Sequence, residues 1–179
     1  EFVIGSCGRL SPVKNYKLLM EIAALVRKEQ NNFRFVLAGE GPEKTYLENL
    51  RARYNLDGSL SMPGHLLDMS SFYRGIDIFI NTSWHEGIPM SVLEAMAHDI
   101  PVIAPDVGGL PEIIDHGTDG FLVSRHSPAI FADRCLELNS DRRKWERMSL
   151  AAGQKIKSKF SVDRMAENYA RLYHETAHV

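Results

Sequence analysis

Short apolar runs alternate with amphipathic segments along most of the 179 residues. The apolar runs have the length of buried strands, and the segments between them repeat apolar residues at helical spacing. The pattern predicts strands at 2–6, 33–38, 60–62, 76–80, 102–104 and 120–123. It predicts helices at about 18–30, between 42 and 54, at 69–74, from 89 onward, and at 128–138, 141–160 and 161–176. Strands that alternate with helices indicate an α/β fold, here one Rossmann-like three-layer domain over residues 1–179 with helices on both faces of a parallel sheet.

Five loops follow the carboxyl ends of predicted strands, and in an open parallel sheet these ends meet at one edge, where ligands bind. The loops are 7–14, 39–42, 63–66, 82–89 and 105–111. Each contains glycine, which either lets the backbone approach a ligand closely or merely turns the chain. The five loops together favour a ligand site at this edge, although no single glycine does.

Composition narrows the class of function. A net charge of −2 leaves no basic stripe for nucleic acid, and no apolar run has the length of a membrane span. The histidines lack metal-ligand spacing and no Asp-x-Asp pair occurs, so we expect no metal site. Two cysteines without a Cys-x-x-Cys motif are typical of a reducing cytoplasm. Because the chain begins within a strand and without an initiator Met, we interpret it as a piece of a longer protein, with a mature processed form as the alternative.

Arg9 and Lys14 lie on either side of a short segment just before the first predicted helix. Two cations beside a helix amino terminus could clamp a diphosphate, with arginine as a bidentate donor and lysine as a point charge. The alternative is that both are solvated surface cations. The loop is neither a Walker A sequence nor a G-x-G-x-x-G fingerprint, which disfavours nucleoside triphosphatases and nicotinamide enzymes.

Glu86 and Glu94 bracket a short segment that leaves the fourth strand, turns at Gly87 and Pro89, and opens a helix. The amino end of that helix points N–H groups beyond the sheet, which suits an anion. Glu94 has apolar neighbours along the chain, where a sugar diol could hydrogen-bond it. Glycosidases also use a pair of carboxylates, which flank the glycosidic bond. Here one carboxylate lies on the loop and the other inside the helix, which suits contacts with two different parts of a ligand. The alternative is a helix-entry acid followed by a solvent-facing acid.

Taken together, these segments resemble the C-terminal, donor-binding domain of family-4-type retaining glycosyltransferases, one half of the GT-B fold. Residues 8–15 are similar to the family's G-R-L-x-x-x-K-G/N loop, and 39–42 to its G-x-G-P turn. Residues 86–97 match E-x₇-E followed by A-M-A, and 101–123 match P-V-I-A…G-G-x-P-E-I-I…G-x-x-G-F-L-V. The matches run from about residue 4 to about residue 175 in the family's order. This order is far more specific than any one motif.

The resemblance implies a role for each matching residue. The implied catalytic residues are Arg9 and Lys14, which would neutralise a leaving diphosphate without a metal, and Glu86, which would hold the hydroxyls of the donor sugar. Glu94 would accept hydrogen bonds from both ribose hydroxyls. The other implied donor-binding residues would act mainly through backbone: Gly8, Gly39 and Gly41 in the glycine-rich turns, Gly64, His65 and Leu66 beside the nucleobase, and Gly87, Ile88, Pro89, Met90, Ser91 and Val92 over sugar and phosphate.

The resemblance implies a metal-independent transferase whose substrate is a nucleotide-diphosphate sugar, with UDP favoured over GDP, and which needs no cofactor. The acceptor would be a glycan or a glycolipid, bound by an N-terminal domain that this chain lacks, so we expect the chain alone to be inactive. We expect a cytoplasmic protein, or one peripheral to the cytoplasmic face of the membrane. The alternatives are a phosphorylase or sugar-nucleotide epimerase on the same scaffold, and a non-catalytic nucleotide-sugar-binding module.

Two places depart from the family pattern. Asn81 stands where the family often has proline, and His98-Asp99 replace a helix end that usually contains glycine. Aspartate tolerates the left-handed conformation that a helix end needs, so we expect Asp99 to cost little. We expect neither change to touch a ligand contact. In this family the terminal helix crosses to the missing domain, so we expect residues 161–176 to expose an apolar patch.

Overall fold

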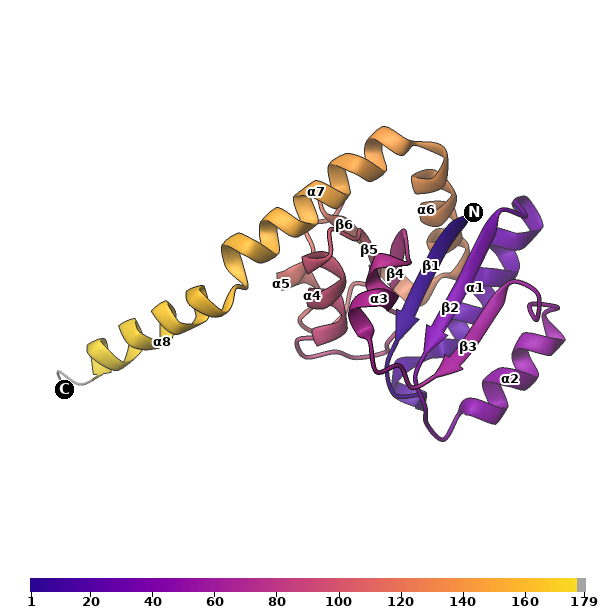
Figure 1. Ribbon diagram of the computed structural model, residues 1–179, viewed down its shortest axis with the longest axis horizontal. Coiled ribbons are helices and arrows are strands. Elements are labelled where there is room, and N and C mark those ends of the chain that lie inside the picture. Colours follow the sequence, from indigo (N-terminus) through magenta and orange to yellow (C-terminus); the bar gives the residue numbers. More distant parts are fainter. Residues whose placement is uncertain (177–179) are drawn as a thin grey trace.

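A computed structural model describes residues 1–176, apart from the side chain of Arg125. Its centre is a six-stranded parallel sheet with the strand order β3-β2-β1-β4-β5-β6 (Figure 1). The strands are β1 (Phe2–Cys7), β2 (Phe33–Ala38), β3 (Leu60–Gly64), β4 (Ile78–Ile80), β5 (Val102–Pro105) and β6 (Gly120–Val123). All six predicted strands are present, and the predicted fold class is confirmed.

Helices cover both faces of the sheet. One face carries α1 (Tyr16–Glu29), α2 (Lys44–Arg53) and α6 (Pro128–Ser140). The other carries α3 (Met69–Arg74), α4 (Met90–Ala97) and α5 (Leu110–Ile113). The long α7 (Arg142–Lys159) contributes to both cores, and two short 3₁₀ turns, η1 (Pro12–Lys14) and η2 (Ser124–His126), follow β1 and β6.

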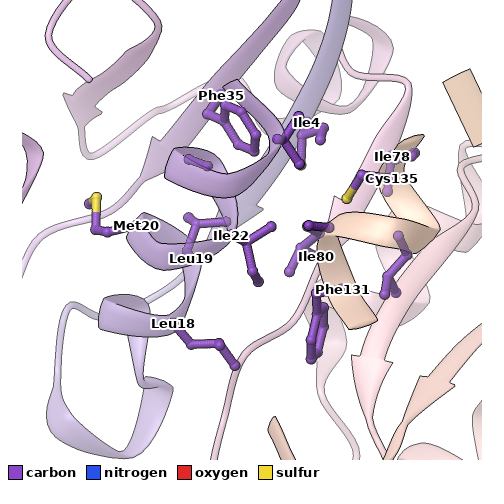
Figure 2. Close-up of a cluster of buried hydrophobic side chains, with 14 of the residues drawn as sticks. Ile4, Leu18, Leu19, Met20, Ile22, Phe35, Ile78, Ile80, Phe131 and Cys135 are labelled. Carbon is purple, nitrogen blue, oxygen red and sulfur yellow. The ribbon is translucent and has the colours of Figure 1, made fainter. Parts of the chain in front are cut away.

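Side chains of the strands alternate between two cores, as the pleat of a strand requires. In β4, Ile78 and Ile80 enter one core while Phe79 enters the other. Figure 2 shows the first of these cores, where Ile22 of α1 and Phe131 of α6 lie on either side of Ile80. Burial on both faces explains why the strand segments are mostly apolar along the sequence instead of alternating between apolar and polar residues.

Several element ends differ from the predicted ones by one or two residues, and the starts of β4 and α4 are among them. β4 begins at Ile78 rather than Ile76, and the Asp77 carboxylate accepts the Val3 N–H (2.8 Å) in place of a strand carbonyl. α4 begins at Met90, with Pro89 as an extended N-cap residue rather than the first helical residue. The sequence pattern does not predict α5, because a single turn is too short to show a helical period. Asp99 adopts the left-handed conformation (φ 59°) as expected.

The strand order reverses direction between β1 and β4, because the chain returns from β3 to the other side of β1. In open parallel sheets, ligands bind in the crevice outside the strand ends at this point. The two loops that leave β1 and β4 carry Arg9, Lys14 and Glu86. The topology therefore brings the two candidate motifs to the same crevice.

The last helix, α8 (Val162–Thr176), has no buried side chain, and Figure 1 shows it extending from the end of α7 away from the sheet. Its exposed apolar residues are Val162, Met165, Tyr169, Leu172 and Tyr173. The prediction of an exposed apolar patch on this helix is confirmed. Within residues 1–176, no helix combines the length and the hydropathy needed to cross a bilayer.

Candidate functional site

The loops that leave β1 and β4 are hydrogen-bonded to each other. Thr82 Oγ1 donates to the carbonyl oxygen of Lys14 (2.7 Å), and the Trp84 N–H donates to the carbonyl oxygen of Val13 (2.9 Å). These bonds connect residues that are far apart in the sequence. They fix the position of the first loop relative to the loop that carries Glu86.

Glu86 is buried at this junction, and three donors converge on one of its carboxylate oxygens. Oε1 accepts hydrogen bonds from Lys14 Nζ (2.7 Å), Ser83 Oγ (2.5 Å) and Asn81 Nδ2 (3.1 Å). Burial by itself would raise the pKa of Glu86, but these donors and the Lys14 charge outweigh burial, so the pKa lies below its ordinary value. Oε2 accepts no hydrogen bond from residues 1–176. Glu86 is thus an ionised, oriented carboxylate with one oxygen still able to accept.

Asn81 corrects one expectation. We expected this departure from the family pattern to touch no site contact, whereas its side-chain amide donates to Glu86 and its side-chain oxygen accepts the Ser83 N–H (2.9 Å). Its backbone N–H also donates to the Ile103 carbonyl (3.0 Å) within the sheet. A proline would make none of these bonds. Asn81 therefore continues the sheet and supports Glu86.

Two glycines allow a third loop to close over Glu86. The Gly109 N–H donates to the Glu86 carbonyl (3.1 Å), and Gly108, in the left-handed conformation (φ 54°), lies against the same carbonyl. A β-carbon on Gly108 would overlap the backbone of Glu86, and one on Gly109 would overlap that of Gly87. The close approach of two backbones therefore requires glycine at both positions.

Glu94 lies on the exposed side of α4. Its Oε2 accepts a hydrogen bond from the Tyr73 hydroxyl (2.8 Å), which also lies 3.5 Å from Cys7 Sγ. Burial raises the pKa of Tyr73 well above its ordinary value, so the phenol remains protonated and able to donate. The His98 ring stacks on the Tyr73 ring, with 5.1 Å between centroids. A buried tyrosine therefore orients a carboxylate that is otherwise open to solvent.

A cleft of about 400 Å³ opens where the loops that follow β1, β2 and β3 meet. Its lining comprises Cys7, Gly8, Arg9, Ala38, Gly39, Glu40, His65, Leu66 and Met69. The predicted donor-binding residues Gly8, Arg9, Gly39, His65 and Leu66 are therefore brought together. Lys14, Glu86 and Glu94 lie outside this lining. Cys7 lies between the cleft and Glu94, because it lines the cleft and contacts the Tyr73 hydroxyl, which donates to Glu94.

The remaining predicted glycines differ in what they do. Gly39 lies so close to the Gly8 carbonyl that no β-carbon would fit, and Gly64 has a left-handed conformation (φ 81°). Gly41 packs against the backbone of Leu10 and is absent from the cleft lining. Gly41 therefore holds the loop together, whereas Gly39 shapes the cleft wall.

The amino end of α4 offers fewer N–H groups than predicted. The Val92 N–H donates to the Pro89 carbonyl (3.1 Å) and the Val92 side chain is fully buried, so Val92 presents no group to a ligand. Pro89 has no N–H. Within residues 1–176, no acceptor lies opposite the N–H groups of Gly87, Ile88, Met90 and Ser91. These four are the amides that an anion could use.

Sequence reasoning missed Tyr73, Ser83 and the contact of Asn81. Ser83 carried a usable signal, because a hydroxyl three residues before a carboxylate can reach it across a turn. Tyr73 carried none, since its bond to Glu94 depends on how α3 packs against α4.

Charged groups elsewhere form structural pairs. Lys155 of α7 is buried and lies 2.8 Å from Asp115 Oδ2 and 3.1 Å from Asp119 Oδ2, which ties α7 to the segment before β6. In the part of the chain that the structure describes, no group of three His, Cys, Asp or Glu side chains could hold a metal ion. The crevice between β1 and β4, where the strand order reverses, is the candidate ligand site.

Comparisons with known proteins show the family of the chain. A family model described as "Glycosyl transferases group 1" matches residues 1–141. The putative glycosyltransferase EpsD of Bacillus subtilis (strain 168) is 31% identical over 97% of this chain and 45% of EpsD. The poly(ribitol-phosphate) alpha-N-acetylglucosaminyltransferase of Staphylococcus aureus (strain COL) is 28% identical over 97% of this chain and 35% of that protein. The chain thus spans about a third to just under half of these relatives.

Two solved structures have closely similar folds. A TarM mutant of S. aureus, crystallised with Fondaparinux, alpha-GlcNAc-glycerol and UDP, superposes with a TM-score of 0.91 at 27% identity, over 97% of this chain and 35% of TarM. The C-terminal domain of the group 1 protein LpcC from Francisella tularensis superposes with a TM-score of 0.83 at 28% identity. That match covers 90% of this chain and 87% of the LpcC domain.

Proposed function

Because this chain belongs to the group 1 glycosyl transferases as the C-terminal, donor-binding domain of their GT-B fold, we propose that it binds a UDP-sugar in the crevice between β1 and β4. Within a longer protein it transfers the glycosyl group to a glycan or lipid-linked glycan with retention of configuration and without a metal. The UDP in the TarM complex, at 27% identity, supports the choice of base.

The observation that carries this proposal is the Lys14–Glu86 ion pair, 2.7 Å between Nζ and Oε1. It joins the two loops at the strand reversal and leaves Glu86 Oε2 free to accept a sugar hydroxyl. The Lys14 charge lies at the same point, where a diphosphate would leave. One pair therefore brings together a group for the sugar and a group for the leaving anion.

The donor would extend in both directions from this pair. Its diphosphate would face Arg9, Lys14 and the free amides of Gly87, Ile88, Met90 and Ser91. The ribose diol would donate to Glu94, which Tyr73 holds in place. The base would lie in the cleft beside His65 and Leu66, with Gly64 just before them at the end of β3.

The chemistry that these groups support is the departure of an anion. The bond between the anomeric carbon and the diphosphate oxygen breaks with its electron pair on the diphosphate. The acceptor hydroxyl oxygen bonds to that carbon and gives its proton to an oxygen of the departing diphosphate. Fixed cations and helix amides stabilise the negative charge as it develops. Retention is inferred from the family, because the residues themselves show no evident nucleophile.

The acceptor would bind to a domain outside this chain, which is consistent with the chain spanning 35% and 45% of the relatives described above. We therefore expect no transfer by the isolated chain. We place the full enzyme in the cytoplasm, peripheral to the membrane where its acceptor is lipid-linked.

Calorimetric titration with UDP, GDP and UDP-glucose tests the proposal. We expect UDP to bind, GDP to bind more weakly, and Lys14→Ala to lower the affinity for UDP about tenfold through loss of a charge-assisted bond. Lys17→Ala is the matched control, because Lys17 is an exposed lysine three residues away on α1. An affinity for UDP that is the same in both variants and the parent would refute the assignment.

A further inference from the structure

Trp84 is an exposed indole next to the proposed reaction centre. It lies two residues before Glu86, and 57% of its surface is exposed. The backbone of Trp84 is nevertheless fixed, because its N–H donates to the Val13 carbonyl (2.9 Å). A large aromatic ring that is held beside a carboxylate proposed to bind sugar is well placed to contact the same ligand.

The imidazole ring of His126 packs against the indole ring of Trp84. The two ring centroids are 4.3 Å apart with a 39° angle between the planes. His126 Nε2 lies 2.8 Å from the Ser83 carbonyl, the residue before Trp84, so the histidine is tied to the loop it supports. His126 also has a left-handed backbone (φ 44°), a conformation that residues other than glycine rarely adopt and that recurs at functional sites. Two segments, one after β4 and one after β6, are thus fixed around one exposed indole.

The surroundings of Trp84 suit a sugar better than a protein partner. Its neighbours along the loop, Thr82, Ser83, His85 and Glu86, are polar, while Val13, whose carbonyl accepts the Trp84 N–H, has an exposed side chain. Protein interfaces need a larger contiguous apolar patch. A pyranose ring presents C–H groups on one face and hydroxyls at its rim. An indole can take that face while the adjacent Glu86 Oε2 accepts a hydroxyl.

We propose that Trp84, backed by His126, is a stacking platform for a pyranose ring beside Glu86. This proposal rests on the proposed function, since it is the assignment of Glu86 that makes a sugar the occupant. The ring comes either from the donor or from the acceptor glycan. Both have the same chemistry, and the experiment below distinguishes them.

The two indole N–H signals in a ¹H–¹⁵N correlation spectrum test the platform. Trp84 and Trp145 are the two tryptophans, and Trp84→Phe and Trp145→Phe assign the signals. Trp145 donates its Nε1–H to the Asp77 carbonyl and so serves as an internal reference for folding. The probes are UDP, UDP-glucose, UDP-N-acetylglucosamine, methyl α-D-glucopyranoside and its N-acetylglucosamine counterpart, each at increasing concentration.

We expect a sugar to shift the Trp84 signal and leave that of Trp145 in place. A shift with the methyl glycosides in the presence of UDP supports the acceptor ring, and a shift with UDP-sugars only, beyond that caused by UDP, supports the donor ring. If UDP binds and no sugar moves Trp84, the platform is refuted while the proposed function stands. If UDP fails to bind but a glycoside moves the Trp84 signal, the platform stands and the proposed function is refuted. A shift that follows protein concentration instead of sugar indicates self-association and also refutes the platform.

Variants add a second readout. We expect Trp84→Ala to weaken binding of the responding sugar about tenfold, while Trp84→Phe keeps most of it because a flat ring remains. His126→Ala keeps the indole but removes its support, so we expect an intermediate loss. In all three variants the affinity for UDP itself should stay within about twofold of the parent. Equal losses for UDP and for the sugar would indicate a collapsed loop and refute the platform.

Discussion

The surroundings of Glu86 and of Glu94 differ more than those of any other two acids in the proposed site. Glu86 is buried, and three donors from two loops converge on its Oε1. Glu94 is exposed and accepts one hydrogen bond, from Tyr73. Glu86 is thus held by the fold through one carboxylate oxygen, whereas Glu94 is an exposed acid that we propose binds the ribose. The loss of Glu86 should therefore affect stability, and the loss of Glu94 should affect binding.

The largest effect that we predict is on binding by Glu94→Ala. Loss of a carboxylate that accepts two ribose hydroxyls should cost about 3 kcal/mol, or roughly 100-fold in affinity for UDP. The free energy of unfolding should fall by no more than about 1 kcal/mol, because the side chain is exposed and the Tyr73 hydroxyl keeps the Ser91 carbonyl (3.4 Å) as an acceptor. Calorimetry and urea denaturation measure the two quantities. Glu146→Ala, which removes an exposed acid on α7, is the control. If Glu94→Ala binds UDP as tightly as the parent does, the proposed contrast between Glu86 and Glu94 is wrong.

The next effect is on stability. Glu86→Ala leaves Lys14, Ser83 and Asn81 without their shared acceptor, so the free energy of unfolding should fall by about 2 kcal/mol. Glu86→Gln keeps an oxygen that can accept and should lose less. Urea denaturation of both variants measures this. If Glu86→Ala is as stable as the parent, then the three hydrogen bonds add nothing to the fold.

Most of the fold could be predicted from the sequence, because its physical signals are local. A buried strand such as 102–105 is apolar throughout, and glycine and proline mark the turns that follow the strands. The predictions that failed concern a very short helix and a strand end that depends on a side chain. The single turn α5 is below the length of a helical period, and the start of β4 depends on a side chain, Asp77, that replaces a backbone partner.

The candidate site could be predicted only in part. Arg9, Lys14 and Glu86 follow from the order of strands and loops, since the strand reversal brings β1 and β4 together. The hydrogen bonds between them could not be predicted, because they depend on side-chain positions set by packing. Tyr73 was indistinguishable from an ordinary core aromatic, and Val92 was assigned to the ligand although its N–H is used within the turn.

Tyr73→Phe sharpens the comparison from the side of Glu94. It removes one hydroxyl and keeps the buried ring, so Glu94 loses its only protein donor within residues 1–176. We expect the affinity for UDP to fall by about 1 kcal/mol, roughly fivefold. In the double variant with Glu94→Ala, the two losses of binding free energy for UDP should be less than additive, because the tyrosine acts through the carboxylate. Tyr169→Phe on α8 is the control, and full additivity would contradict this coupling.

The smallest effect is a pH dependence that belongs to Glu86. Its pKa is lowered in the folded protein, so its ionised form contributes stability above the unfolded-state value, which is about 4.3. That contribution should be lost as the pH falls from there through the folded-state pKa. The stability difference between the parent and Glu86→Gln, from urea denaturation at several pH values, should be constant near neutrality and shrink in acid. A difference that stays constant down to pH about 3 would mean that the charge of Glu86 adds nothing beyond its shape, and the contrast with Glu94 would then be one of burial alone.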